Sequence, residues 1–290
     1  QENPANQENQ EGPENPENYT KNGVVMEEFK FMGHEARALR DGNVITTGYA
    51  LSDMAMKLEN ETISYLAEEF FVVWDPWTLA QPNVQHLLWA SDYVSLEDAV
   101  DVLKKQGESD NTEVIMEIYP LDDALLQEFY LMSFHISSVS VSDDDALYVV
   151  TLRNLHTVLA INRTSLELVW QFSSVLDRND FAFASEADKF WNPHDAQLTT
   201  VNGTQRLCLM DDGYYHNKCQ EEVLHVDYYC YSRGVCYVLD EQAATSATAF
   251  EFSYPNRGVL TLEQQHEDIF NMNGGSVEPI PDSQHMLTAF

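Results

Sequence analysis

One pattern of short apolar segments separated by turns recurs along the chain, and this repeat constrains the possible fold more than any other feature. Each complete copy has two apolar segments joined by a tight turn, then a loop, then two further apolar segments. Complete copies begin at His34, His135 and His194, and a partial copy begins at Gly274. The chain should therefore fold as a series of similar β units that stack, because one such unit alone cannot bury its apolar face.

The first turn of every complete copy is rich in residues that tolerate a positive φ angle. These turns are Asp41-Gly42, Asp143–Asp145 and Asn202-Gly203. Asp-Gly and Asn-Gly pairs between apolar segments are typical of β-hairpins. Four antiparallel strands per unit are typical of a propeller blade, so we predict an all-β fold, a β-propeller of four-stranded antiparallel blades.

The number of blades leaves the closure of the ring open. The repeat accounts for about three and a half blades, whereas closed propellers have about 4–8. An open array would expose an apolar flank, which soluble proteins rarely tolerate. Either the N-terminal stretch completes the fourth blade with its own strand, or further blades lie outside this chain.

A polar tail and two insertions surround or interrupt the repeat. Residues 1–22 consist mainly of Gln, Glu, Asn and Pro and are expected to be disordered, because they cannot bury enough apolar area to offset chain entropy. Residues 23–290 are predicted to form one propeller-like domain. Its insertions lie at about 94–130 and 211–231.

The first insertion is predicted to be helical. Within residues 94–106, Leu96, Val100 and Leu103 fall on one face of an amphipathic helix. Residues 120–132 then continue either as a second helix or as a lead-in from helix to strand.

The charge of the chain excludes two classes of partner. The 48 Asp and Glu residues against 15 Lys and Arg residues give a formal net charge of -33. Nucleic-acid binding depends on basic contacts that release counterions, and anionic membranes attract basic surfaces. No apolar run approaches the roughly 18–20 residues that a membrane-spanning helix needs. We therefore expect neither nucleic-acid binding nor membrane insertion.

Four cysteines, all within the third copy and its insertion, indicate disulfide bonds. Cys208 and Cys236 lie in apolar segments that read as neighbouring strands, and Cys219 and Cys230 lie between them. We favour the nested pairs Cys208–Cys236 and Cys219–Cys230 among the three possible pairings. A structural zinc site is disfavoured, because no C-x2-C spacing is present.

Four glycosylation sequons favour the same compartment as the disulfides. Each tripeptide is common by chance, but together with the cysteines they indicate a secreted, extracellular protein. The acceptor residues are Asn18, Asn60, Asn162 and Asn202.

Histidines and arginines at equivalent positions of the copies are the candidate site residues. The first strand of each propeller blade lines the central channel, so residues that open it converge although they are distant in sequence. His34, His135 and His194 occupy this position, while Arg153 ends one second strand and Arg233 begins one third strand. Arginine beside histidine in so acidic a chain would form a positive pocket suited to a small anion.

Each of these residues also has an ordinary structural interpretation. A histidine at a strand start is commonly a packing residue, and the two arginines could pair with nearby acids such as Asp143 or Asp240. Three histidines could also bind a metal, since imidazole is a common ligand. The neighbouring arginines argue against a cation, and turn 143–145 lacks the spacing of a calcium loop. We therefore expect neither a metal nor a cofactor.

The second and third copies resemble the arylsulfotransferase family, in its bacterial type and its eukaryotic relatives. The resemblance rests on FHISSVSVSDDDALYVVTLRNLHTVLAINRTSLELVWQF, WNPHDAQLTTVNGTQRLCLMDDG and YSRGVCYVLD. The family pattern runs from His-x-x-Ser through a Ser/Thr-x-Arg strand end to His-Asp, and then to Ser-Arg before a strand that ends in Asp. The similarity is close over about 130–255 and loose over about 24–90 and 270–290.

This resemblance implies a six-bladed propeller whose active site lies in the central channel. It implies transfer of a sulfuryl group from an aryl sulfate to another phenol without a nucleotide donor. In the family one histidine is transiently sulfated, while other histidines and an arginine hold the sulfuryl oxygens. By motif match, His135, His194 and Arg233 fall on active-site positions, and Arg153 matches the arginine that ends the second strand.

The chain departs from the family pattern at two positions. The sulfated histidine should open a later blade, and the corresponding position here is Gly275-Ser276. Ala196 follows where the bacterial enzymes have asparagine, and His34 is a candidate substitute nucleophile.

Two functions therefore remain open from the sequence. One is an arylsulfotransferase-like protein that binds a small aryl sulfate or phenol. The other is a non-catalytic extracellular propeller that binds protein partners through its acidic surface or its insertions, because one fold can host unrelated functions.

Overall fold

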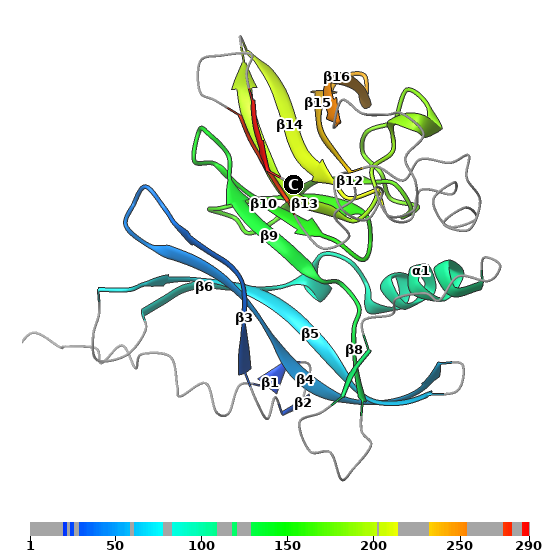
Figure 1. Ribbon diagram of the computed structural model, residues 1–290. Helices are drawn as coiled ribbons and strands as arrows, with labels where there is room; N and C mark the ends of the chain where they lie inside the picture. Colours follow the sequence, from blue (N-terminus) through cyan, green and yellow to red (C-terminus); the bar gives the residue numbers. More distant parts are fainter. Residues whose placement is uncertain are drawn as a thin grey trace, which may run out of the picture.

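The fold of this chain is mostly β, as the repeat predicts, with one α-helix among the residues that can be described (Figure 1). The computed structural model describes residues 20–21, 24–25, 29–58, 61–77, 83–108, 118–120, 129–201, 203–213, 232–253, 275–279 and 286–289. Three larger sheets and two small two-stranded sheets are formed by these residues. No helix of the described part is long and apolar enough to cross a membrane.

The second repeat unit folds as one four-stranded antiparallel sheet. Its strands follow the order β12-β11-β10-β9, so that each strand pairs with its neighbour in sequence. The bounds are β9 (Ile136–Val141), β10 (Leu147–Leu152), β11 (Thr157–Asn162) and β12 (Leu168–Ser173). In the turn between β9 and β10, Asp145 has a φ of 63°. The predicted four-strand unit and its hairpin turn are both confirmed here.

The third repeat unit forms a second four-stranded meander. Its bounds are β13 (Pro193–Val201), β14 (Thr204–Asp211), β15 (Arg233–Asp240) and β16 (Thr245–Ser253). Gly203 has a φ of 78° in the first turn. Cys208 and Cys236 lie directly opposite each other on β14 and β15 and form a disulfide. One of the two predicted pairs is thus confirmed, and Cys219 and Cys230 lie outside the described residues.

The first repeat unit departs from the four-strand pattern. Its sheet has the order β3-β4-β5-β8-β7, and β6 also pairs with β5. The bounds are β3 (Phe29–Ala38), β4 (Val44–Leu58), β5 (Glu61–Asp75), β6 (Asn83–Trp89), β7 (Ile118–Pro120) and β8 (Phe129–Met132).

The length of β5 explains this departure. Residues 70–75 of β5 pair with β6, whereas residues 63–67 pair in parallel with β8. One edge of the long strand β5 therefore pairs with two strands, β6 and β8. Strand β8 lies at the end of the helical insertion. Helix α1 (Leu96–Glu108) begins that insertion as predicted, with Val100 and Leu103 buried. Of residues 120–132, the part at Phe129–Met132 is a strand.

Two short hairpins mark the ends of the described chain. Strand β17 (Ser276–Pro279) pairs with β18 (Met286–Ala289) and lies close to β13 and β14, where a fourth unit would begin. Strand β1 (Thr20–Lys21) pairs with β2 (Val24–Val25). The last part of the segment predicted to be disordered therefore carries a strand, and residues 1–19 lie outside the described residues.

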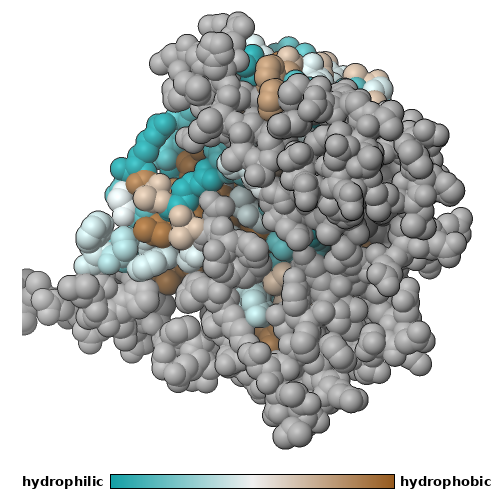
Figure 2. All heavy atoms as spheres, viewed as in Figure 1, coloured by the Kyte–Doolittle hydropathy of each residue, from teal (hydrophilic) through white to brown (hydrophobic). Residues whose placement is uncertain are grey.

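Exposed apolar side chains are scattered over several elements. Figure 2 shows hydrophilic and hydrophobic residues intermixed on the described surface of one face. The large exposed hydrophobic residues of the described part are Trp77, Val84, Val169, Phe250 and Phe252.

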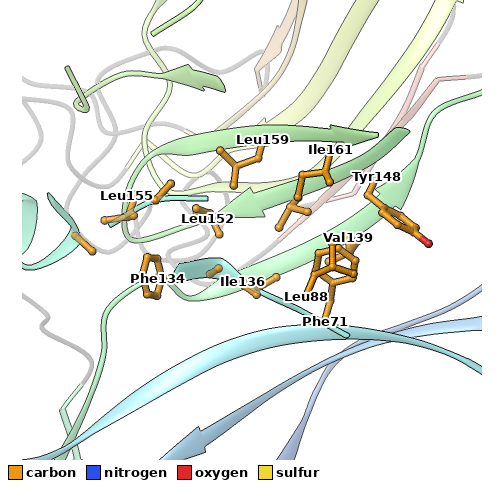
Figure 3. Packing of buried hydrophobic residues seen from close by; sticks show 14 of the residues in the cluster. Phe71, Leu88, Phe134, Ile136, Val139, Tyr148, Leu152, Leu155, Leu159 and Ile161 are labelled. Carbon is orange, nitrogen blue, oxygen red and sulfur yellow. The ribbon is translucent and has the colours of Figure 1, made fainter. Parts of the chain in front are cut away.

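The middle sheet, β9 to β12, is buried on both faces. Along β10, Val150 and Leu152 belong to a core shared with the first sheet, whereas Val149 belongs to a core shared with the third sheet. Figure 3 shows the first of these cores, in which Phe71 and Leu88 approach the middle sheet from the first. The three sheets therefore pack face to face, which is how blades pack in a propeller. Their arrangement as blades of a closed ring stays a prediction.

Replacement of Phe172 tests the packing between the second and third sheets. Its fully buried ring contacts the rings of Phe181, Phe183, Phe190 and Tyr237. Phe172→Ala should lower the free energy of unfolding by about 3–5 kcal/mol in urea denaturation.

The matched control is Val169→Ala, whose side chain on the same strand is 47% exposed. It should change the free energy of unfolding by less than about 0.5 kcal/mol. Similar effects of the two substitutions would contradict the burial of Phe172 between the second and third sheets.

Candidate functional site

The starts of β9 and β13 bring two predicted site residues together. His135 directly precedes β9, and His194 is the second residue of β13. The two strands are side by side (Figure 1), and Ser137 Oγ donates a hydrogen bond to the carbonyl of Pro193 at 2.9 Å. The centroids of the two imidazole rings lie 6.4 Å apart. Two histidines 59 positions apart in sequence thus face each other.

A buried carboxylate of the first sheet holds the backbone at His135. Glu69 on β5 is 1% exposed and accepts hydrogen bonds from the N–H groups of Phe134, His135 and Ile136 at 2.8–2.9 Å. His135 has a φ of 48°, a left-handed conformation that is rare for a residue with a side chain. The three bonds offset the cost of this conformation, so Glu69 sets the direction in which the imidazole leaves the chain.

Arg153 places a buried positive charge at the same end of the middle sheet. It directly follows β10 and is 5% exposed. Its backbone N–H donates a hydrogen bond to the carbonyl oxygen of His135 at 2.9 Å. Its Nη1 donates to Asn154 Oδ1 at 3.2 Å. Its charge also acts on two neighbouring ionisable groups. With burial as the larger cause, it contributes to the lowered pKa of His156, and it opposes the rise that burial causes in the pKa of Asp212.

A third imidazole, which the sequence did not single out, lies in this cluster. His156 is fully buried, has a φ of 46°, and accepts a hydrogen bond at Nδ1 from the N–H of Asn192 at 2.9 Å. Burial, together with the charge of Arg153, lowers the pKa of His156 to about 3. This ring is therefore neutral at pH 7 and serves as a fixed hydrogen-bonding group.

His194 faces a second buried carboxylate. Its Nδ1 lies 3.0 Å from Asp212 Oδ2 and 3.1 Å from the carbonyl oxygen of Asn192. Burial raises the pKa of Asp212 to about 6, against the lowering effect of His194 and Arg153. Asp212 is thus mainly ionised at pH 7, directly beside the imidazole.

Arg233 is bound within the third sheet. Its Nε donates to Asp211 Oδ2 at 2.7 Å, and its Nη1 lies 3.1 Å from Glu251 Oε2. It also donates to the carbonyls of Ala187 and Lys189. Burial raises the pKa of Asp211, and the charge of Arg233 opposes this rise. The described bonds of Arg233 therefore tie β14, β15 and β16 to one loop.

The acids considered from the sequence as partners of the arginines have other bonds. Asp143 Oδ2 accepts the N–H of Thr200, and Asp240 Oδ1 accepts the N–H groups of Gln242 and Ala243. Arg233 does pair with acids, but these are Asp211 and Glu251, not Asp143 or Asp240.

The remaining predicted residues lie apart from this cluster or outside the description. His34 falls within β3, and its side chain is not among the described ones. Asn162 ends β11, and its Oδ1 accepts the N–H groups of Thr164 and Ser165. Asn18, Asn60 and Asn202 lie outside the described residues. Within the described ranges, no three His, Cys, Asp or Glu side chains are grouped to bind a metal ion.

Glu69→Gln should disrupt the start of β9. The amide can accept hydrogen bonds through one atom only and turns an N–H donor toward other donors, so part of this buried group loses its partners. We expect the free energy of unfolding to fall by about 1–3 kcal/mol in chemical denaturation. The exposed Glu167→Gln is the matched control, and an equally small effect of both would contradict the role assigned to Glu69.

The pKa of His156 predicts a loss of stability in acid. The unfolded chain binds a proton at this residue below about pH 6.5, whereas the folded chain does so only below about pH 3. The contribution of neutral His156 to the free energy of unfolding is therefore complete above pH 6.5 and declines as the pH falls toward about 3. His156→Gln should show a shallower fall in unfolding free energy over this window, and an identical fall in both proteins would refute the assignment.

Comparison with known proteins identifies the family of this chain. The family model described as Arylsulfotransferase (ASST) matches residues 18–259, a stretch that contains every histidine, arginine and carboxylate of this cluster. A search of curated proteins found no match. On the extent of the family match, this chain belongs to the arylsulfotransferase family.

Proposed function

We propose that this protein binds an aryl sulfate between His135 and His194 and transfers its sulfuryl group to a phenol. The observation that carries the proposal is the pair of imidazoles 6.4 Å apart, presented by two neighbouring sheets of a family member. A small group between the rings would have an imidazole on each side, near the distance of about 3 Å at which such groups interact. Arg153 would supply positive charge as the transferring group develops negative charge.

The charge of the protein makes a local cation necessary for this function. With a net charge of -33, the chain as a whole repels an anionic substrate. Arg153 is 5% exposed, so its charge is weakly screened by solvent at the place where it acts. Arg233 stays a second candidate clamp on the strength of the motif match, and in its described bonds it supports the carboxylate of Asp211.

We further propose a secreted protein in which the stacked sheets are radial blades around a central channel. The face-to-face packing of the sheets supports this arrangement, because it turns the starts of β9 and β13 toward the same side. The disulfide Cys208–Cys236 and the sequon at Asn162 support an oxidising, secretory compartment.

A non-catalytic anion-binding module is the second candidate function. The position that corresponds to the family's sulfated histidine is Gly275-Ser276, at the beginning of β17. A chain without that nucleophile could retain the pocket and bind an aryl sulfate without transferring its sulfuryl group. In that case the insertions or the acidic surface would carry the interaction with a partner.

A transfer assay with p-nitrophenyl sulfate and a phenol acceptor tests the enzymatic proposal. Arg153→Gln should lower kcat/KM by about 10²–10³, as expected for loss of a preorganised group that stabilises developing charge. Arg178→Gln is the matched control, because that side chain is 54% exposed. Transfer that is absent, or equal in both variants, would exclude the proposed role of Arg153 in catalysis.

Thermal denaturation separates the two candidate functions from a protein without an anion site. Sulfate or an aryl sulfate should raise the melting temperature of the wild type, since a ligand that binds the native state stabilises it. His135→Asn with His194→Asn should remove this rise. A wild type that is indifferent to both ligands would contradict the pocket itself.

A further inference from the structure

The backbone of one residue, Asn192, assigns different tautomers to two histidines. Its N–H donates to His156 Nδ1 at 2.9 Å, and its carbonyl oxygen lies 3.1 Å from His194 Nδ1. An N–H cannot accept and a carbonyl cannot donate. His156 Nδ1 therefore has no proton, whereas His194 Nδ1 carries one.

The carboxylate of Asp212 reinforces the state of His194. Its Oδ2 lies 3.0 Å from the same Nδ1, so that two acceptors surround this nitrogen. Asp212 itself is 0% exposed. With the proton held at Nδ1, the lone pair of the neutral ring is on Nε2. A buried acid that orients an imidazole in this way also stabilises the positive charge that the ring gains when Nε2 reacts.

We infer that His194 Nε2 is the atom that accepts the sulfuryl group, with Asp212 as its positioning residue. This inference rests on the proposed function and deepens it, because it names a nucleophile. From the sequence, Gly275-Ser276 is expected at the position of the family's sulfated histidine. His135 then faces the sulfated ring from the neighbouring strand, with the two ring centroids 6.4 Å apart.

The reaction balances in two steps. The Nε2 lone pair forms a bond to sulfur, the bond between sulfur and the aryl oxygen breaks, and its electron pair leaves with the aryloxide. The imidazole becomes cationic beside the carboxylate of Asp212, whose Oδ2 lies 3.0 Å from Nδ1. In the second step the acceptor oxygen attacks sulfur, the N–S bond breaks, and its electron pair returns to Nε2. The proton released by the acceptor phenol balances the proton that the departed aryloxide takes up.

The charges around Asp212 determine the expected pH dependence. Burial raises the pKa of Asp212, His194 and Arg153 oppose this rise, and the neighbouring Asp211 adds to it. Below a pH of about 6, protonation of Asp212 removes the negative charge that the sulfated ring requires. The rate of transfer should therefore fall as the pH falls through this value.

The tautomer can be measured in the full-length wild type without any substrate. Long-range proton–nitrogen NMR correlations in protein labelled at its histidines should show a proton on Nδ1 of His194 and on Nε2 of His156. His194→Gln and His156→Gln identify the signals. A proton on Nε2 of neutral His194 would overturn the inference, whatever the enzyme does.

Trapping and a single substitution test the chemical step. Wild type incubated with p-nitrophenyl sulfate and no acceptor should gain the mass of one SO3 group on the peptide that contains His194. Asp212→Asn should lower kcat by about 10²–10⁴ and abolish the acidic limb of the pH profile. Asp101→Asn, at an exposed position of α1, is the control and should change neither.

The outcomes separate this inference from the proposed function. An SO3 group found on His194, together with loss of the acidic limb of the pH profile in Asp212→Asn, supports the inference. Transfer by the wild type with label on another residue, or an unchanged limb in Asp212→Asn, overturns the inference and leaves the function standing. A wild type that neither transfers the sulfuryl group nor gains stability from an aryl sulfate overturns both.

Discussion

The burial of the middle sheet on both faces is the constraint on which the rest of the structure depends. Val149 and Val150 are adjacent in β10, yet they belong to two different cores, because successive side chains of a strand point to opposite faces. A sheet that is apolar on both sides must be covered by a sheet on each side. This stacking brings the starts of β9 and β13 side by side, where His135 faces His194.

Buried charges complete the site that the stacking begins. Glu69 reaches from the first sheet to the start of the second, and Asp212 reaches from the end of β14 to His194 on β13. Glu69 joins two sheets through three hydrogen bonds, whereas Asp212 lies within the third unit and faces His194. Both carboxylates are buried, and each lies against an imidazole or its backbone.

The sequence was sufficient to predict the local and repetitive features. The four strands of the second and third units, the helix at Leu96–Glu108, the Cys208–Cys236 pair and the meeting of His135 with His194 follow from periodicity and from equivalent positions in the repeat. The extra strands of the first sheet could not be predicted in the same way, because they depend on how far the insertion returns along β5. Strand pairing at such separations leaves no local pattern.

The supporting residues of the site were missed for a related reason. Glu69 was visible only as an acid inside an apolar run, which is a weak signal of a buried carboxylate. His156 and Asn192 adopt positive φ angles that their residue types alone do not indicate. Arg233 was expected at an anion pocket from its motif, whereas its described partners are acids and carbonyls of its own unit. Such roles are set by three-dimensional neighbours.

The proposed function depends on an anion site between His135 and His194, and anomalous diffraction from crystals containing selenate tests this site most directly. Selenate has the shape and charge of sulfate, and selenium can be located without assumptions about its position. We expect a selenium peak between the rings of His135 and His194, with selenate oxygens at about 3 Å from their nitrogens. A peak only at other places, or none, would contradict the account.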